Sequence, residues 1–177
     1  MFNNVYIENF KKNFPIKPMN QKQNTIDNLN NNVNIILGID FDNTIINYDK
    51  LIYSLALEKS FLPAETPKNK KAVRDTIRQL PDGDLKWQEI QAEAYGPSIS
   101  KATLNPGVKK LLATCHQFHI PYYIISHKTK YSNLLNGGTN LQEAALHWMQ
   151  QQHFFNDHKF RLSKKQIFFL SIVVLYF

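Results

Sequence analysis

Residues 35–46 read IILGIDFDNTII, an apolar run that ends in two carboxylates and a hydroxyl. A short continuous apolar run that turns polar is typical of a buried strand in a parallel sheet, and ligands of such sheets bind at the carboxyl ends of the strands. Residues two apart on an extended chain share a face, so we expect Asp40, Asp42 and Thr44 to point into one small volume. Two carboxylates held this close repel each other unless a cation, a proton or a phosphoryl group lies between them. The pattern favours chemistry at the end of this strand over its alternative, an ordinary strand followed by an Asp-rich turn.

The segment DFDNT at residues 40–44, after an apolar strand, resembles the first motif of the haloacid dehalogenase-like hydrolase superfamily. The family usually has Gly where Asn43 stands, and Asn also tolerates unusual backbone angles. With the segments AVRD, YGP and SHKT, which begin at residues 72, 95 and 126, the chain is similar over residues 35–169 to a small-cap subgroup of unknown substrate. The resemblance implies an α/β fold: a Rossmann-like three-layer parallel sheet with a helical cap inserted after the first strand.

The chain has 177 residues and a formal net charge of +7, which suits anionic partners. No run of Lys and Arg with interleaved aromatic residues is present, so nucleic-acid binding is not expected, and phosphorylated small molecules would profit from the same positive field. Cys115 is the single cysteine, which excludes an intrachain disulfide and a cysteine zinc site. The N-terminus has no pattern of a secretory signal, so we expect a cytoplasmic protein. The oligomeric state is left open.

Composition divides the chain into a tail and one domain. Residues 1–34 are rich in Asn, Lys and Gln and are expected to form a disordered or loosely attached tail. The domain would span residues 35–177, with its core at 35–47 and 104–177 and its cap at 48–103.

Three helices are expected in the cap, starting near Asp49, Asn69 and Asp84. The second of them carries several basic residues, which form either a solvated face or a contact to an anionic substrate, with Arg74 as the best candidate. After the cap we expect a helix over residues 108–118.

A second apolar run, residues 122–125, ends in Ser126, His127 and Lys128. By resemblance this is the superfamily's second motif, in which the hydroxyl holds a phosphoryl oxygen, and Lys128 would add charge stabilisation. A Thr-x-x-Gln capping box then predicts a helix that starts at Thr139.

The resemblance fails toward the C-terminus, where a basic third motif and an acidic fourth motif are expected. After Ser126 the acids are Glu143 and Asp157, and neither follows a later strand. Residues 167–169 suit a third strand, but the apolar residues that follow form neither a turn nor a crossover helix. We therefore expect a chain that is truncated or frame-shifted near Leu170, with an incomplete edge of the sheet. The apolar end is too short for a membrane span, which needs about 20 residues.

The resemblance implies a magnesium-dependent phosphatase for a small phosphorylated metabolite. Asp40 would be the nucleophile and Asp42 the general acid and base. Mg²⁺ would bind the Asp40 carboxylate and the Asp42 main-chain carbonyl, and Thr44, Ser126 and Lys128 would orient and hold the phosphoryl group. Lys164 or Lys165 would have to replace the third motif, although each precedes its strand. The alternative is a catalytically impaired remnant that only binds phosphate or a partner.

Overall fold

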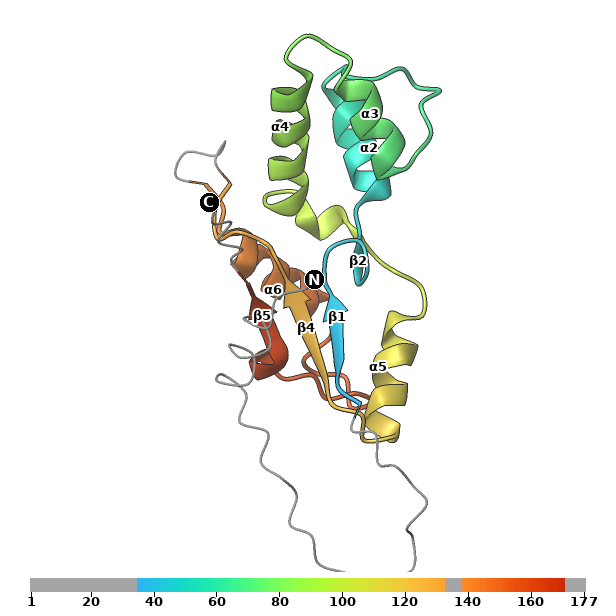
Figure 1. Cartoon of the computed structure of the whole chain (residues 1–177), viewed down its shortest axis with the longest axis vertical. Coiled ribbons are helices and arrows are strands. Elements are labelled where there is room, and N and C mark those ends of the chain that lie inside the picture. The colour runs from blue at the N-terminus through green and yellow to red at the C-terminus, as the bar shows by residue number, and fades with distance from the viewer. Residues whose placement is uncertain (1–34, 133–137, 171–177) are drawn as a thin grey trace, which may run out of the picture. The chain divides into compact units, whose positions relative to one another are not determined.

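A three-stranded parallel sheet forms the centre of the part of the chain that the computed structural model describes, residues 35–132 and 138–170. Its strands are β1 (Leu37–Asp40), β4 (Tyr122–Ser126) and β5 (Ile167–Phe169), in the order β1-β4-β5 (Figure 1). The register sets Asp40 opposite Ile125 and Ser126 opposite Phe169. The carboxyl ends of β1 and β4 therefore lie side by side. The three strands confirm the predicted α/β class and its parallel sheet.

Two helices make the connections that parallel strands require. Helix α5 (Val108–Gln117) precedes β4, and helix α6 (Leu141–Gln151) links β4 to β5. Aromatic side chains pack between these elements and the sheet: the rings of Phe41 and Trp148 meet edge to face with their centroids 5.8 Å apart. Both side chains are fully buried, so the segment after β1 is anchored in the core by the residue between its two aspartates.

A helical insert interrupts the chain between two very short strands, β2 (Ile46–Asn47) and β3 (Thr103–Leu104), which pair antiparallel. The insert contains α2 (Asp49–Glu58), α3 (Lys70–Ile77), α4 (Gly83–Tyr95) and the short 3-10 helix η1 (Ile99–Lys101). Figure 1 shows α2, α3 and α4 packed against one another. The three predicted helices are confirmed, whereas β2 and β3 were not predicted because two residues are too few to show a period.

Local signals explain where these helices begin. Asn69 caps α3, because its side chain accepts a hydrogen bond from the amide of Ala72. The helix predicted from Thr139 in fact begins two residues later, at Leu141, because Asn140 is its cap and accepts hydrogen bonds from the amides of Gln142 and Glu143. The prediction of a Thr139 capping box was therefore wrong: Asn140 is an equally good cap and lies next to the first buried residue of α6.

Two predictions fall on residues outside the described part, namely the loose tail at 1–34 and the apolar end at 171–177. Within the described part, β5 ends at Phe169 and β1 lies at one edge of the sheet. No helix among the described residues is long and apolar enough to cross a membrane.

Candidate active site

The polar residues predicted from the two motifs meet at the carboxyl ends of β1 and β4. Asp40 is the last residue of β1, and its carboxyl group is exposed. Asn43 has a φ of 64°, a left-handed conformation that Asn adopts more readily than most residues, and the turn it makes carries Thr44 back toward the strand. The Thr44 hydroxyl then lies 3.4 Å from Oδ2 of Asp40. The turn therefore keeps the first aspartate open to solvent, with a hydroxyl beside it.

The second aspartate, Asp42, is held by three donors from two segments, the end of β4 and the residue before α2. Nζ of Lys128 lies 2.9 Å from its Oδ1, and the phenol of Tyr48 donates to the same oxygen at 2.9 Å. The hydroxyl of Ser126 donates to Oδ2 at 3.2 Å. The structure thus brings together Asp42, Ser126 and Lys128 as predicted and adds Tyr48, the residue directly before α2.

Lys128 is a buried cation with only 2% of its side chain exposed. Its ammonium group lies 4.1 Å from the ring centroid of Tyr95 and 5.6 Å from that of Tyr48, in addition to its ion pair. The backbone around it is fixed as well, since its amide donates to Ser126 Oγ and its carbonyl accepts from Gln142 Nε2. Burial lowers the pKa of Lys128, and the nearby charge of Asp42 opposes this shift without cancelling it.

The electrostatics distinguish the two carboxyl groups of the site. Loss of surrounding water, and then the charge of Asp42, raise the pKa of Asp40, while the Thr44 hydrogen bond acts in the opposite direction. The pKa of Tyr48 is also raised, chiefly by burial and then by Asp42, so its phenol stays protonated and remains a donor. Asp40 is therefore the accessible carboxyl group of the pair, and Asp42 is the anchored one.

The helical insert contributes to the site in a way that the sequence did not reveal. Tyr48 lies directly before α2, and Tyr95 is the last residue of α4. Their ring centroids are 4.7 Å apart beside Lys128. Lys70, at the start of α3, donates from Nζ to the Tyr95 phenol at 2.7 Å. The signal for these residues was only an aromatic at each end of the insert.

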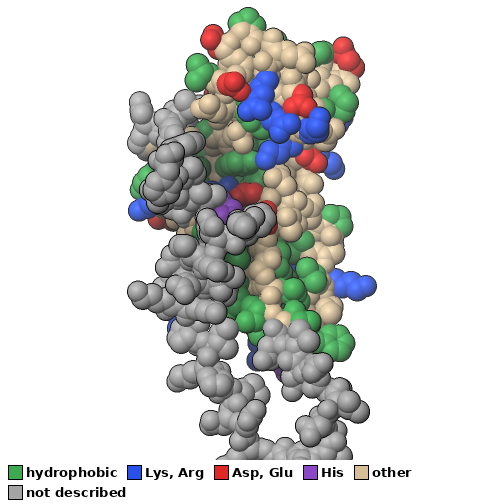
Figure 2. Space-filling model, in the orientation of Figure 1, with side chains coloured by type: hydrophobic (Ala, Val, Ile, Leu, Met, Phe, Trp, Pro, Cys, Tyr) green, Lys and Arg blue, Asp and Glu red, His purple; other side chains and the backbone are tan. Residues whose placement is uncertain are grey.

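The basic residues of α3 mostly pair with acids of the insert. Arg74, the best candidate above for a substrate contact, lies 2.8 Å from Asp75, and Arg78, directly after α3, lies 2.8 Å from Asp84. Figure 2 shows Lys and Arg side chains gathered with acidic ones over this end of the molecule. Since Lys70 is the α3 cation that touches Tyr95, it is a better candidate than Arg74 for a role near the site.

The two lysines considered as substitutes for the third motif lie away from this group. Lys164 and Lys165 belong to the 3-10 helix η2 (Lys164–Gln166), which leads into the amino end of β5. In a parallel sheet the amino ends of the strands lie at the edge opposite the carboxyl ends, where Asp40 and Ser126 are found. Neither lysine therefore reaches the site.

The donor groups of the site suit magnesium only in part. Mg²⁺ usually takes one or two protein carboxylates, and water and phosphate oxygens complete its octahedron. Asp40 offers an exposed carboxylate, but the Asp42 carboxylate already has the Lys128 ammonium on Oδ1. Within residues 35–132 and 138–170, no three His, Cys, Asp or Glu side chains come together as a metal site. The remaining protein donors are thus the two that the resemblance implies, the Asp40 carboxylate and the Asp42 main-chain carbonyl.

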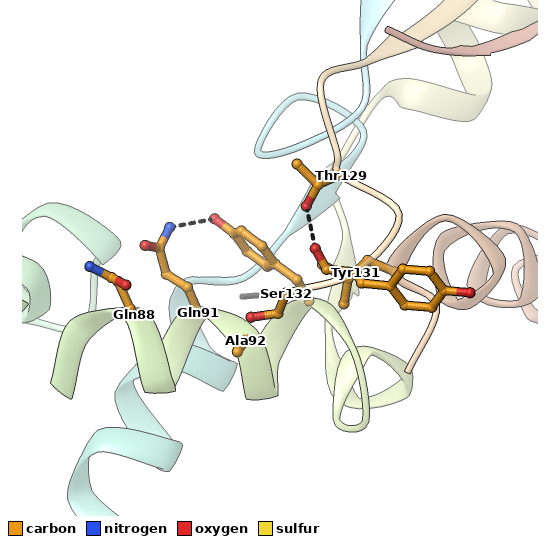
Figure 3. A pocket seen from close by; sticks show the side chains of 8 residues that line it. Gln88, Gln91, Ala92, Thr129, Tyr131 and Ser132 are labelled. Carbon is orange, nitrogen blue, oxygen red and sulfur yellow. Dashed lines mark hydrogen bonds between the residues drawn. The ribbon is translucent and has the colours of Figure 1, made fainter. Parts of the chain in front are cut away.

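A cavity of about 220 Å³ adjoins the ion pair, between α4 and the loop after β4. Figure 3 shows Gln88 and Gln91 on the α4 side and Thr129 on the loop side. Tyr95 lines this cavity and also contacts Lys128, so the cavity and the candidate active site share a wall.

Comparison with known proteins gives no assignment. No family model, no curated protein and no solved structure matches the chain. Its function must therefore be inferred from the residues of the site.

Proposed function

We propose that this chain is a magnesium-dependent phosphatase of the haloacid dehalogenase-like type, with a Rossmann-like core and a helical cap. Its substrate would be a small phosphorylated metabolite. The observation that carries the proposal is the contrast between the two aspartates at the end of β1: Asp40 is exposed, whereas Asp42 is fixed by Lys128, Tyr48 and Ser126. One accessible carboxylate beside an anchored charge pair is an arrangement suited to nucleophilic attack on phosphorus.

In the first half of the reaction, an oxygen of Asp40 would attack the phosphorus atom and the bond to the leaving oxygen would break. Asp42 would enter this step as the carboxylic acid and give its proton to the leaving oxygen, so the products are an aspartyl-phosphate, an alcohol and the Asp42 carboxylate. In the second half, water would attack the aspartyl-phosphate and pass a proton to Asp42, which releases inorganic phosphate and restores Asp40. Atoms and charge balance over the two steps.

The surrounding groups would stabilise the phosphoryl oxygens during both steps. Ser126 and Lys128 lie at the end of the neighbouring strand, and the buried ammonium acts at low effective dielectric, where a fixed charge has its largest effect. Bound magnesium, held by the Asp40 carboxylate and the Asp42 carbonyl, would neutralise the charge that otherwise keeps a phosphate dianion from Asp40.

The test is hydrolysis of an aryl phosphate by the full chain, with and without magnesium, alongside Asp40→Asn. We expect activity that requires the ion and Asp40, and a mass gain of one phosphoryl group in acid-quenched protein. Asp82→Asn is the matched control, because Asp82 is an exposed aspartate in α4's capping position without a side-chain capping bond. Equal activity of the Asp40 variant would refute the proposal.

A second candidate function is phosphate binding without turnover. It is favoured by the same contacts that anchor Asp42, since a carboxylate with donors on both oxygens is poorly placed to exchange protons. A folded chain that is inactive but binds inorganic phosphate in a titration, with loss of binding in Lys128→Met, would support this alternative.

A further inference from the structure

We propose that the cavity between α4 and the loop after β4 binds the leaving group of the substrate, and that this group is an uncharged, hydrogen-bonding ring. The inference rests on the proposed function and adds the chemical class of the substrate. Its basis is the position, the size and the lining of the cavity.

The position of the cavity follows from one residue that belongs to both sites and from a second that is next to a site residue in the chain. Tyr95 lines the cavity and lies 4.1 Å, measured from its ring centroid, from the ammonium of Lys128. Thr129, on the opposite wall, directly follows Lys128 in the chain. The loop wall is held in place by α6, because the amide of Leu141 donates to the carbonyl of Lys130 at 2.9 Å. A substrate whose phosphoryl group contacts Lys128 would thus have the cavity directly beside it.

The lining selects the chemistry of the group. The described residues that line the cavity are Gln88, Gln91, Ala92, Tyr95, Thr129, Tyr131, Ser132 and Leu141, and none of them is an Asp, Glu, Lys, Arg or His. A charged leaving group would therefore lose its water without gaining an ionic partner in the lining, which is costly. Two amide side chains, each both a donor and an acceptor, favour a neutral group that hydrogen-bonds in both directions.

The two amides are presented together by the helix. Gln88 and Gln91 are three residues apart on α4, so they lie on the same face of the helix (Figure 3). Gln91 Nε2 approaches the Tyr95 phenol only at 3.4 Å, a long contact that a ligand can replace at little cost. The Tyr95 ring adds a flat apolar surface against which a ring can pack.

The volume limits the size of the group. Pockets for drug-sized ligands typically measure about 300–1,000 Å³. A cavity of about 220 Å³ is smaller and accommodates a single ring, such as the sugar of a hexose phosphate or the ribose of a nucleoside monophosphate. Both have the required chemistry, a neutral ring with several donors and acceptors.

The experiment compares kcat/KM of the full chain for four phosphate monoesters. A hexose phosphate and a nucleoside monophosphate carry neutral hydrogen-bonding rings, phosphoglycolate carries a carboxylate, and an aryl phosphate carries an apolar ring. We expect one of the first two to exceed both others by at least tenfold, and which of them it is identifies the source of the ring. A preference for phosphoglycolate or for the aryl ester would overturn the inference.

Variants of Gln91 connect the preference to the cavity. Gln91→Leu is expected to lower kcat/KM for the preferred ester about tenfold, and at least five times more than for the aryl ester. Gln91→Lys should shift the preference toward phosphoglycolate. Gln117→Leu, at the exposed end of α5, is the control and should change neither ratio. A uniform effect of Gln91→Leu on every ester would show that the cavity does not select the leaving group.

A binding measurement separates this inference from the proposed function. Asp40→Asn should bind the preferred ester without turnover, with a Kd that rises about tenfold when Gln91→Leu is added. If the chain hydrolyses the aryl phosphate but the Kd does not depend on Gln91, the cavity does not bind the leaving group, and the proposed phosphatase function still stands. Absence of any Asp40-dependent hydrolysis would refute the phosphatase, and the leaving-group assignment with it.

Discussion

Substitution of Lys128 by Met tests whether the buried ion pair anchors Asp42. The change keeps the length and apolar stem of the side chain but removes the ammonium that lies 2.9 Å from Oδ1 of Asp42. Removing one partner of a buried pair typically costs about 3–5 kcal/mol, because the other charge is left uncompensated. Asp42 keeps the donors Tyr48 and Ser126, and 22% of its side chain is exposed. We therefore expect a smaller loss of about 2–3 kcal/mol in the free energy of unfolding.

The double variant Lys128→Met/Asp42→Asn distinguishes the pair from simple packing. With both charges gone, no uncompensated group remains, and the desolvation of Lys128 that lowers its pKa is relieved as well. Replacing a whole buried pair is often neutral, so we expect the double variant to lie within about 1 kcal/mol of the wild type.

Urea unfolding at pH 7, followed by the fluorescence of the buried Trp87 and Trp148, measures both effects. With a slope of about 1–3 kcal/mol per molar urea, the single variant should show a midpoint lowered by about 1 M. Lys110→Met, at an exposed position of α5, should stay within about 0.5 kcal/mol of the wild type. The reasoning is refuted if Lys128→Met is as stable as the wild type, or if Asp42→Asn does not restore stability.

Three further predictions concern the same corner of the molecule. Burial lowers the pKa of Lys128 in the folded chain below its ordinary value, so the unfolded chain binds more protons at pH values between the two and wild-type stability should rise with pH there. Urea midpoints of the wild type and of Lys128→Met against pH check this, and equal slopes would contradict it. Asn43→Ala should cost about 1–2 kcal/mol because its φ is 64°, while Asn43→Gly should be close to neutral; thermal melts of both variants decide. The raised pKa of Asp40 means that its ionised form opposes folding, so Asp40→Asn should melt higher than wild type at pH 7, by an amount that shrinks as the pH is lowered toward 3.8. A lower melting temperature at pH 7 would show that the ionised carboxylate stabilises the fold.

The regular elements were predictable because each has a local cause. The apolar runs before Asp40 and Ser126 indicated buried strands, and Asn69 marked the start of α3. Adjacent signals were harder to separate, as Thr139 and Asn140 show: both residue types cap helices, and only the folded backbone decides between them.

Half of the candidate site could be read from the motifs, and the other half depends on contacts distant in sequence. Asp42 and Ser126 were expected to meet, since each follows a strand of one parallel sheet. The burial of Lys128 was not predictable, because lysine is rarely buried and the rings of Tyr48 and Tyr95 that cover it come from the insert. The pattern of a single sequence does not show that the residues at the ends of α2 and α4 will lie against the end of β4.

The short pairing of β2 with β3 brings the two ends of the insert together. The chain leaves the core at Ile46 and returns at Leu104, and these two residues are register partners. The ends of the insert are thus as close as the two strands of a hairpin. The side chain of Asn105, directly after β3, holds the returning chain against the turn after β1 by donating to the carbonyls of Asn43 and Thr44. A different helical segment can therefore be exchanged here without moving the ends of the core strands, provided that it keeps Tyr48, which donates to Asp42, and the Tyr95 ring beside Lys128. The chain thus has one place at which evolution or engineering can change what covers the site while the reacting residues stay in position.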